Sequence, residues 1–171
     1  MNNQDRIYSY EPVVDSGCRL LILGTMPSVK SLEDGFYYAH PRNAFWPMMA
    51  EILGEARPAT IEEKKKMLLG HGIALWDTVR SCTRRGSLDS ALRDIELNDI
   101  GALLARYPSI DLILLNGGEA WRLFHKIDPA AYAGREALRM PSTSPAYTLR
   151  YEEKLNAWRA ALENHIAGRC S

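Results

Sequence analysis

The chain has 171 residues, of which 46% are hydrophobic and 25% charged, a balance that excludes a disordered, collagen-like or repeat protein. This length suits one domain, and we expect residues 1–171 to form a single α/β unit. Because 21 basic residues balance 21 acidic ones, the charge argues against a protein that binds nucleic acid mainly through its overall field.

The remaining compositional features predict a cytoplasmic protein with no membrane span, no metal and no cofactor. No apolar run approaches the roughly 20 residues of a membrane helix, and residues 1–6 are polar, unlike a signal peptide. Cys18, Cys82 and Cys170 are widely spaced, so we expect reduced thiols and no disulfide or zinc site. The histidines lack metal-ligand spacing, and no glycine-rich phosphate motif occurs.

Apolar runs of strand length alternate with helical patterns along the chain. The predicted strands are residues 19–23, 72–76, 111–115 and 135–140. The predicted helices are residues 43–53, 61–69 with a capping box at Thr60 and Glu63, a helix capped by Asn98 that ends at Tyr107, a helix through Trp121 and Phe124, and residues 149–166. Residues 78–89 are rich in Ser, Thr, Arg and Gly and predict a long loop, whose Arg80, Arg84 and Arg85 are either a basic rim for phosphates or exposed residues without a partner.

This alternation predicts an α/β fold, a three-layer α/β/α sandwich with a central, mainly parallel four-stranded sheet. The polar segments that follow the strands then lie at one edge of the sheet, where such folds bind ligands. These segments are residues 25–43, 77–85, 116–118 and 141–147. Their aromatic, amide and hydroxyl side chains suit a flat heteroaromatic ligand, which needs a stacking face and hydrogen bonds at its edge.

Five segments together resemble the uracil-DNA glycosylase superfamily, and are most similar to its hypoxanthine-DNA glycosylase (DNA-deoxyinosine glycosylase) family. They are residues 24–28 (GTMPS), 37–46 (YYAHPRNAFW), 72–77 (GIALWD), 114–117 (LLNG) and 140–146 (MPSTSPA), within a match over about residues 19–165. The resemblance implies a monofunctional DNA glycosylase of base excision repair. Such an enzyme flips a deaminated base (hypoxanthine, or else uracil or xanthine) out of DNA and hydrolyses its N-glycosidic bond to leave an abasic site. We expect a monomer whose partner is DNA containing deaminated bases.

The same resemblance assigns the catalytic role to Asn43, in the P-x-N-x-F-W segment. An amide carbonyl can orient a water for attack on an oxocarbenium-like sugar, although Asn is also a good helix cap and the two roles are compatible. Met26 stands where the superfamily's main families carry a water-positioning Asp or Asn, and Ser142 stands nearest to the usual His or Asn of their second motif.

The remaining site residues are also expectations from the resemblance. Those expected to bind the base are Tyr38, Tyr37, Asp77, Asn116 and Met26. Tyr38 aligns with the stacking aromatic, with Tyr37 or Phe36 as alternatives, and Asp77 is in the position of an Asn that reads the edge of uracil. Those expected to contact DNA are Ser28, Ser31, Ser142, Thr143, Ser144 and Tyr147. Structural roles compete with these assignments, since Tyr37 also suits a buried brace and Asp77 a helix cap or an ion pair with Arg80.

Two other functions remain open at this point. One is a binder of damaged DNA or nucleotides that kept the pocket and is catalytically weak or inactive, as the loss of the first-motif Asp or Asn suggests. The other is a hydrolase of free nucleosides, which would act without a duplex.

Overall fold

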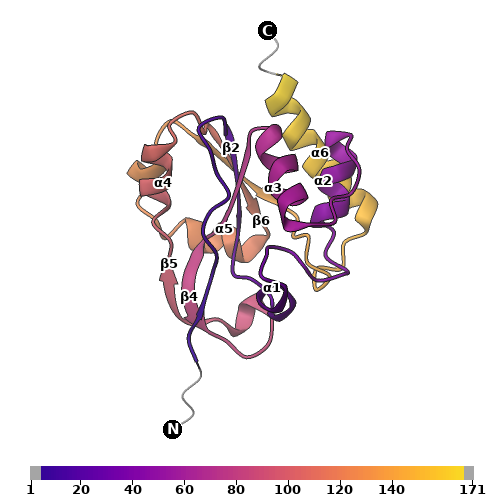
Figure 1. Cartoon of the computed structure of the whole chain (residues 1–171). Coiled ribbons are helices and arrows are strands. Elements are labelled where there is room, and N and C mark those ends of the chain that lie inside the picture. The colour runs from indigo at the N-terminus through magenta and orange to yellow at the C-terminus, as the bar shows by residue number, and fades with distance from the viewer. Residues whose placement is uncertain (1–4, 168–171) are drawn as a thin grey trace.

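A parallel sheet of four strands forms the centre of the molecule in a computed structural model, which describes residues 5–167 (Figure 1). The strands are β2 (Leu20–Gly24), β3 (Ile73–Asp77), β6 (Leu112–Asn116) and β7 (Glu136–Met140), in the order β3-β2-β6-β7. All three pairings are parallel, and each strand begins within one residue of its predicted position. The predicted central sheet is therefore confirmed.

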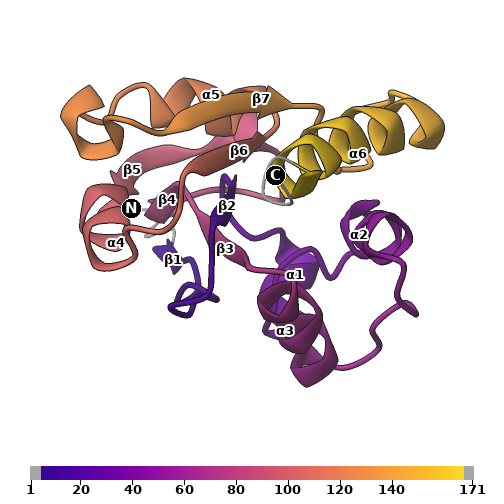
Figure 2. The same ribbon diagram turned by 90° about the horizontal axis from the view of Figure 1, so that it is seen from above.

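Helices cover both faces of this sheet, as the view from above shows (Figure 2). One face carries α2 (Phe45–Leu53), α3 (Ile61–Gly70) and α6 (Tyr151–Ala167), and the other carries α4 (Ile100–Arg106) and α5 (Gly118–Phe124). Because strand side chains alternate, Leu20 and Ile22 enter the first core while Leu21 and Leu23 enter the second. This arrangement confirms the three-layer sandwich.

One predicted helix cap is confirmed and another is wrong. Thr60 and Glu63 form the predicted capping box of α3. Asn98, however, does not cap α4, because its buried amide donates to the carbonyl oxygens of Asp77 and Val79. The carboxylate of Asp99 accepts the N–H of Ala102 and caps the helix instead.

The predicted loop 78–89 is wrong at residues 79–83, which form a strand of a second sheet. This antiparallel sheet has the order β1-β4-β5 and consists of β1 (Ile7–Tyr8), β4 (Val79–Thr83) and β5 (Arg93–Leu97). The connection between β4 and β5 contains a short 3₁₀ helix, η1 (Asp89–Ala91). The strands are short, polar and irregular in register, so they lack the alternation that would have marked them.

Two short helical segments lie outside the predicted pattern. Ser28 caps α1 (Val29–Asp34), which follows β2, and η2 (Pro129–Tyr132) precedes β7. None of the described helices is long and apolar enough to cross a bilayer. Cys18 and Cys82 are buried free thiols, while Cys170 lies outside the described residues.

Candidate active site

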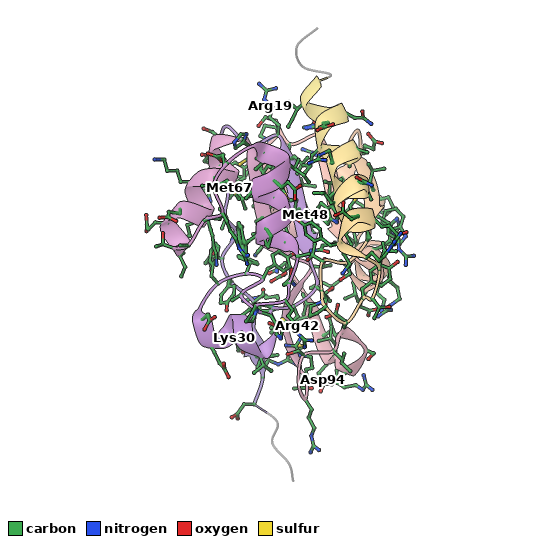
Figure 3. The ribbon with its side chains drawn as sticks, turned by 90° about the vertical axis from the view of Figure 1, so that its right-hand side faces the viewer. Arg19, Lys30, Arg42, Met48, Met67 and Asp94 are labelled. Atoms are coloured by element: carbon green, nitrogen blue, oxygen red, sulfur yellow. The ribbon has the colours of Figure 1, made fainter. Side chains whose placement is uncertain are left out.

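The carboxyl ends of the four parallel strands form one edge of the molecule, and a cavity of about 330 Å³ opens there. The strands end in register, because Gly24 pairs with Asp77 and Asn116 with Met140. Figure 3 places Arg42 and Asp94 at this end and Arg19, which precedes β2, at the opposite end. All predicted site residues line the cavity: Asn43, Tyr38, Tyr37, Asp77, Asn116, Met26, Ser28, Ser31, Ser142, Thr143, Ser144 and Tyr147.

The floor of the cavity is built from Gly24, Asp77 and Tyr38. Asp77 is only 2% exposed, and its Oδ2 atom has no hydrogen-bond partner among the described residues. A Cβ atom on Gly24 would lie 2.5 Å from Oδ1 of Asp77 and 2.7 Å from the hydroxyl of Tyr38. Glycine at this position therefore lets both oxygens approach the end of β2.

Asp77 is the most strongly perturbed acid of the cavity. Burial, together with the charge of Asp89, raises the pKa of its carboxyl to about 8, while the guanidinium of Arg84 acts in the opposite direction. The carboxyl is therefore largely protonated at neutral pH and can donate as well as accept a hydrogen bond.

Tyr38 is held in an uncommon backbone conformation with a φ of 53°. For a residue with a side chain, this left-handed region is strained and persists where the surroundings impose it. The Tyr38 ring packs on Phe45 with 4.3 Å between centroids, and its buried hydroxyl has no hydrogen bond of good geometry among the described residues, although the nearby Asn116 amide acts to lower its pKa. Burial also raises the pKa of this hydroxyl, so it remains a donor.

Asn43 precedes α2 and combines a local turn with a place on the cavity wall. Its Oδ1 accepts the N–H of Phe45 at 3.0 Å, which fixes the orientation of the amide. The next residue, Ala44, donates its N–H to the carbonyl of Thr143 and so ties this segment to the loop after β7. The N-cap position of α2 is Ala44, without a side-chain cap, so Asn43 forms a turn just before the helix and is not its cap. The carbonyl oxygen of Asn43 has a second lone pair, so this turn and water binding are compatible.

Asn116 fixes the loop after β7, which forms one wall of the cavity. Its Oδ1 accepts the N–H of Thr143 and its Nδ2 donates to Oγ1 of Thr143, both at 3.0 Å. Gly117 has a φ of 102°, and a Cβ there would lie 3.1 Å from Cβ of Ser142. Asn116 therefore holds the loop after β7 against the end of β6.

Ser28, Ser142, Ser144 and Tyr147 form the rim, whereas Ser31 is buried. Ser28 accepts the N–H of Ser31, and Ser31, which is 1% exposed, accepts the N–H of Ala39. Ser142 and Ser144 each accept an N–H within their own loop, from Ser144 and Ala146. Tyr147 is 47% exposed.

Two of the expected base-binding residues belong largely to the protein core. Tyr37 is 2% exposed, and its hydroxyl donates to the carbonyl of Glu11 at 2.9 Å, so it braces the loop as well as lining the cavity. Met26 is 7% exposed and packs in an apolar cluster with Val79 and Leu92. It offers the cavity an apolar surface and no group that holds water.

The segment between β4 and β5 supplies four lining residues that were not predicted as site residues, Ser87, Leu88, Asp89 and Ser90. The other four, Gly24, Thr25, Pro27 and Ala146, lie within the segments 24–28 and 140–146 that carry the resemblance. Ser87 accepts the N–H of Val29 at the start of α1, and Arg84 is buried and donates to the carbonyl of Pro27, so the segment is tied to the β2–α1 loop. Arg84 thus anchors the wall, whereas Arg80 and Arg85 are exposed. No local pattern in the sequence marks this return toward the site.

The donor set of the cavity suits an organic ligand better than a cation. Within residues 5–167, no group of three or more His, Cys, Asp or Glu side chains could hold a metal ion. The lining instead combines two carboxyls with amides, hydroxyls and aromatic rings. A flat base that stacks on a ring and forms hydrogen bonds at its edge fits these groups.

Comparison with known proteins assigns this fold and site to a class. Residues 11–165 match the model of the uracil DNA glycosylase superfamily. The chain belongs to that superfamily and is a DNA N-glycosylase, a hydrolase of DNA repair. The resemblance in the sequence motifs is therefore confirmed.

Two named relatives and one solved structure are similar to nearly the whole chain. A hypoxanthine DNA glycosylase from Methanosarcina acetivorans is 32% identical over 156 residues, 91% of this chain and 97% of that protein. Another from Methanosarcina barkeri is 29% identical over 156 residues, 90% of this chain and 96% of that protein. The solution NMR structure of a Methanosarcina acetivorans protein provisionally assigned to the uracil DNA glycosylases is similar, with a TM-score of 0.77 and 31% identity over 93% of this chain and 99% of that chain.

Proposed function

We propose that this glycosylase excises hypoxanthine from DNA and leaves an abasic site. The observation that carries the proposal is the cavity floor, where the Tyr38 hydroxyl and Asp77 Oδ2 are buried without partners. Buried polar atoms are normally satisfied, so these two atoms point to a ligand with a polar edge. The names of the two Methanosarcina relatives support hypoxanthine as that ligand.

In the proposed reaction, the amide of Asn43 holds a water beneath the sugar of the flipped nucleotide. The water oxygen forms a bond to C1′ while the bond from C1′ to the base nitrogen breaks, and the electron pair leaves with the base. One proton of the water ends on the base, and its hydroxyl stays on the sugar. Because the Asn43 amide is already fixed by Phe45, little reorganisation is needed as charge develops.

The lining residues favour hydrolysis without a lyase step. A lyase needs an amine to form a Schiff base, and no lysine is among the residues that line the cavity in the described chain. Lys154 instead donates to the carbonyl of Ser144 and supports the rim.

A catalytically weak binder of damaged DNA is the second candidate. Met26 favours it, because an apolar side chain stands where the superfamily's main families carry Asp or Asn. Such a protein would hold deoxyinosine DNA tightly without releasing the base.

The two candidates separate in a glycosylase assay on duplexes that carry deoxyinosine or deoxyuridine, scored by alkaline cleavage and by electrophoretic binding. We expect the wild type to release hypoxanthine and Asn43→Ala to be slower by at least about 100-fold, on the order of the loss when one positioned hydrogen-bonding group is removed from a reacting centre. Asn43→Ser keeps an oxygen for the turn, and Asn164→Ala changes an exposed residue of α6, so melting temperatures of these controls separate folding from catalysis. Binding without release by the wild type would favour the second candidate.

A further inference from the structure

Asp77 lacks the partners that a buried carboxylate needs. It is 2% exposed, and its Oδ2 is buried with no hydrogen bond among residues 5–167. Its carbonyl oxygen is bound by Asn98, and the strand is held in the sheet, so the carboxyl cannot move to solvent without disturbing β3. An ionised group in this position would cost far more free energy than a neutral acid.

Among the charged groups around Asp77, Asp89 raises its pKa more than Arg84 lowers it. Burial also raises the pKa of Asp89 itself, and Tyr10, Tyr37 and Tyr38 are neutral. Among the described residues, Arg84 is the cation that acts on Asp77; its Nη2 donates to the carbonyl of Pro27, and its Nε and Nη1 are buried without a hydrogen-bond partner. These surroundings raise the pKa of Asp77 to about 8.

We propose that Asp77 binds the flipped base as a neutral carboxylic acid, which donates to a ring carbonyl and accepts from the adjacent ring N–H. This inference rests on the proposed function and defines its substrate class as bases with a lactam edge, such as the O6 and N1–H of hypoxanthine. A protonated carboxyl offers the same donor and acceptor pair as an amide. At the end of β3, a protonated Asp77 can therefore form the same pair of hydrogen bonds with the base as an Asn side chain.

The neutral form also assists the departure of the base. Negative charge develops on the base as the glycosidic bond breaks, and part of it lies on the carbonyl oxygen. The Asp77 O–H would stabilise that oxygen in the transition state, whereas a carboxylate would repel it. The rate should therefore fall when Asp77 ionises.

The test is the pH dependence of kcat/KM on a deoxyinosine duplex for the wild type and Asp77→Asn. Above pH about 8, we expect the wild type to lose about tenfold per pH unit, because the protonated fraction falls at that rate. Asp77→Asn should remain active at neutral pH and should decline only at the higher pH at which the N1–H of the substrate itself ionises, since the amide of the variant cannot ionise. Asp89→Asn should move the wild-type decline to lower pH, because the charge of Asp89 raises the pKa of Asp77.

The outcomes separate this inference from the proposed function. If the wild type releases no base at any pH, the proposed function fails. If it releases hypoxanthine with a rate that is flat or rises above pH 8, or if folded Asp77→Asn shows the same decline as the wild type, only the neutral-acid role fails. Where Asp77→Asn does not fold, the direction of the shift in Asp89→Asn decides the question.

Discussion

Gly24 shows how one missing side chain shapes the site. Its Cα lies at the end of β2 beside Asp77, with which it pairs in the sheet. The two functional oxygens on the cavity floor occupy the space that any larger residue would need. The position is therefore sensitive to a single methyl group even though Gly24 does not itself offer a chemical group.

We expect Gly24→Ala to fold but to lose most of its activity. The added Cβ would lie 2.5 Å from Oδ1 of Asp77 and 2.7 Å from the Tyr38 hydroxyl, so both must move away from the base. Overpacking of this kind typically destabilises a protein by about 1–3 kcal/mol. Steady-state kinetics and thermal unfolding should be compared with Gly70→Ala, where no atom lies within 4 Å of the new Cβ. Activity equal to that of this control would show that the floor tolerates displacement.

At the scale of elements, the parts of the fold that were predicted are those with a local signal. β2 and β6 are buried on both faces, so they appear as continuous apolar runs in the sequence. β4 and β5 gave no such signal, because Arg80 and Thr83 are polar and the pairing is irregular. The partner of β4 on its other side is β1, which lies more than seventy residues earlier in the chain.

The same distinction holds for the site. Asp77 and Asn116 were predicted because both end strands, and the ends of parallel strands meet at one edge. Leu88 and Asp89 were missed because they line the cavity only through the way the β4–β5 connection folds back toward it. Hydrogen bonds to residues far away in the sequence determine this path. The φ of 53° at Tyr38 likewise depends on its surroundings and has no sequence signal.

Two loops present exposed apolar side chains at the mouth of the cavity, Leu88 from the β4–β5 connection and Tyr147 from the segment before α6. They are 58% and 47% exposed. Apolar side chains at such positions can separate stacked bases and stabilise a flipped nucleotide. We expect Leu88→Ala and Tyr147→Ala to slow release from duplex DNA by about tenfold and release from single-stranded DNA much less, because unstacking costs a few kcal/mol only in the duplex.

The control for these variants is Ile166→Ala, which removes a 44% exposed side chain from the end of α6. Rates on the two substrates should be measured under single-turnover conditions. An equal loss on single and double strands would place Leu88 and Tyr147 in contact with the nucleotide itself and not with the duplex.

For the whole molecule, the net charge of zero limits how DNA can be held. Affinity must come from a few local contacts and from the base in its cavity, because no overall positive field attracts the duplex. Each neutralised phosphate contributes about 0.9 to the slope of log affinity against log salt. For Asn43→Ala on a deoxyinosine duplex, measured by fluorescence anisotropy, we expect this slope of log affinity against log salt to be below about 4 in magnitude. In a variant that also carries Arg85→Ala, the slope should fall by about 1 more. A steep slope, typical of basic DNA-binding proteins, would contradict this expectation.

Strand ends and connections between elements both line the cavity, and Tyr38 is the floor residue that lies in a connection. Gly24, Asp77 and Asn116 stand at the ends of paired strands, whereas Ser28, Leu88 and Tyr147 stand in connections between elements. In evolutionary terms, this separation lets two properties of the molecule change independently. The chemical identity of the excised base can change through single exchanges at the strand ends, and the grip on the surrounding DNA can change through insertions in the loops.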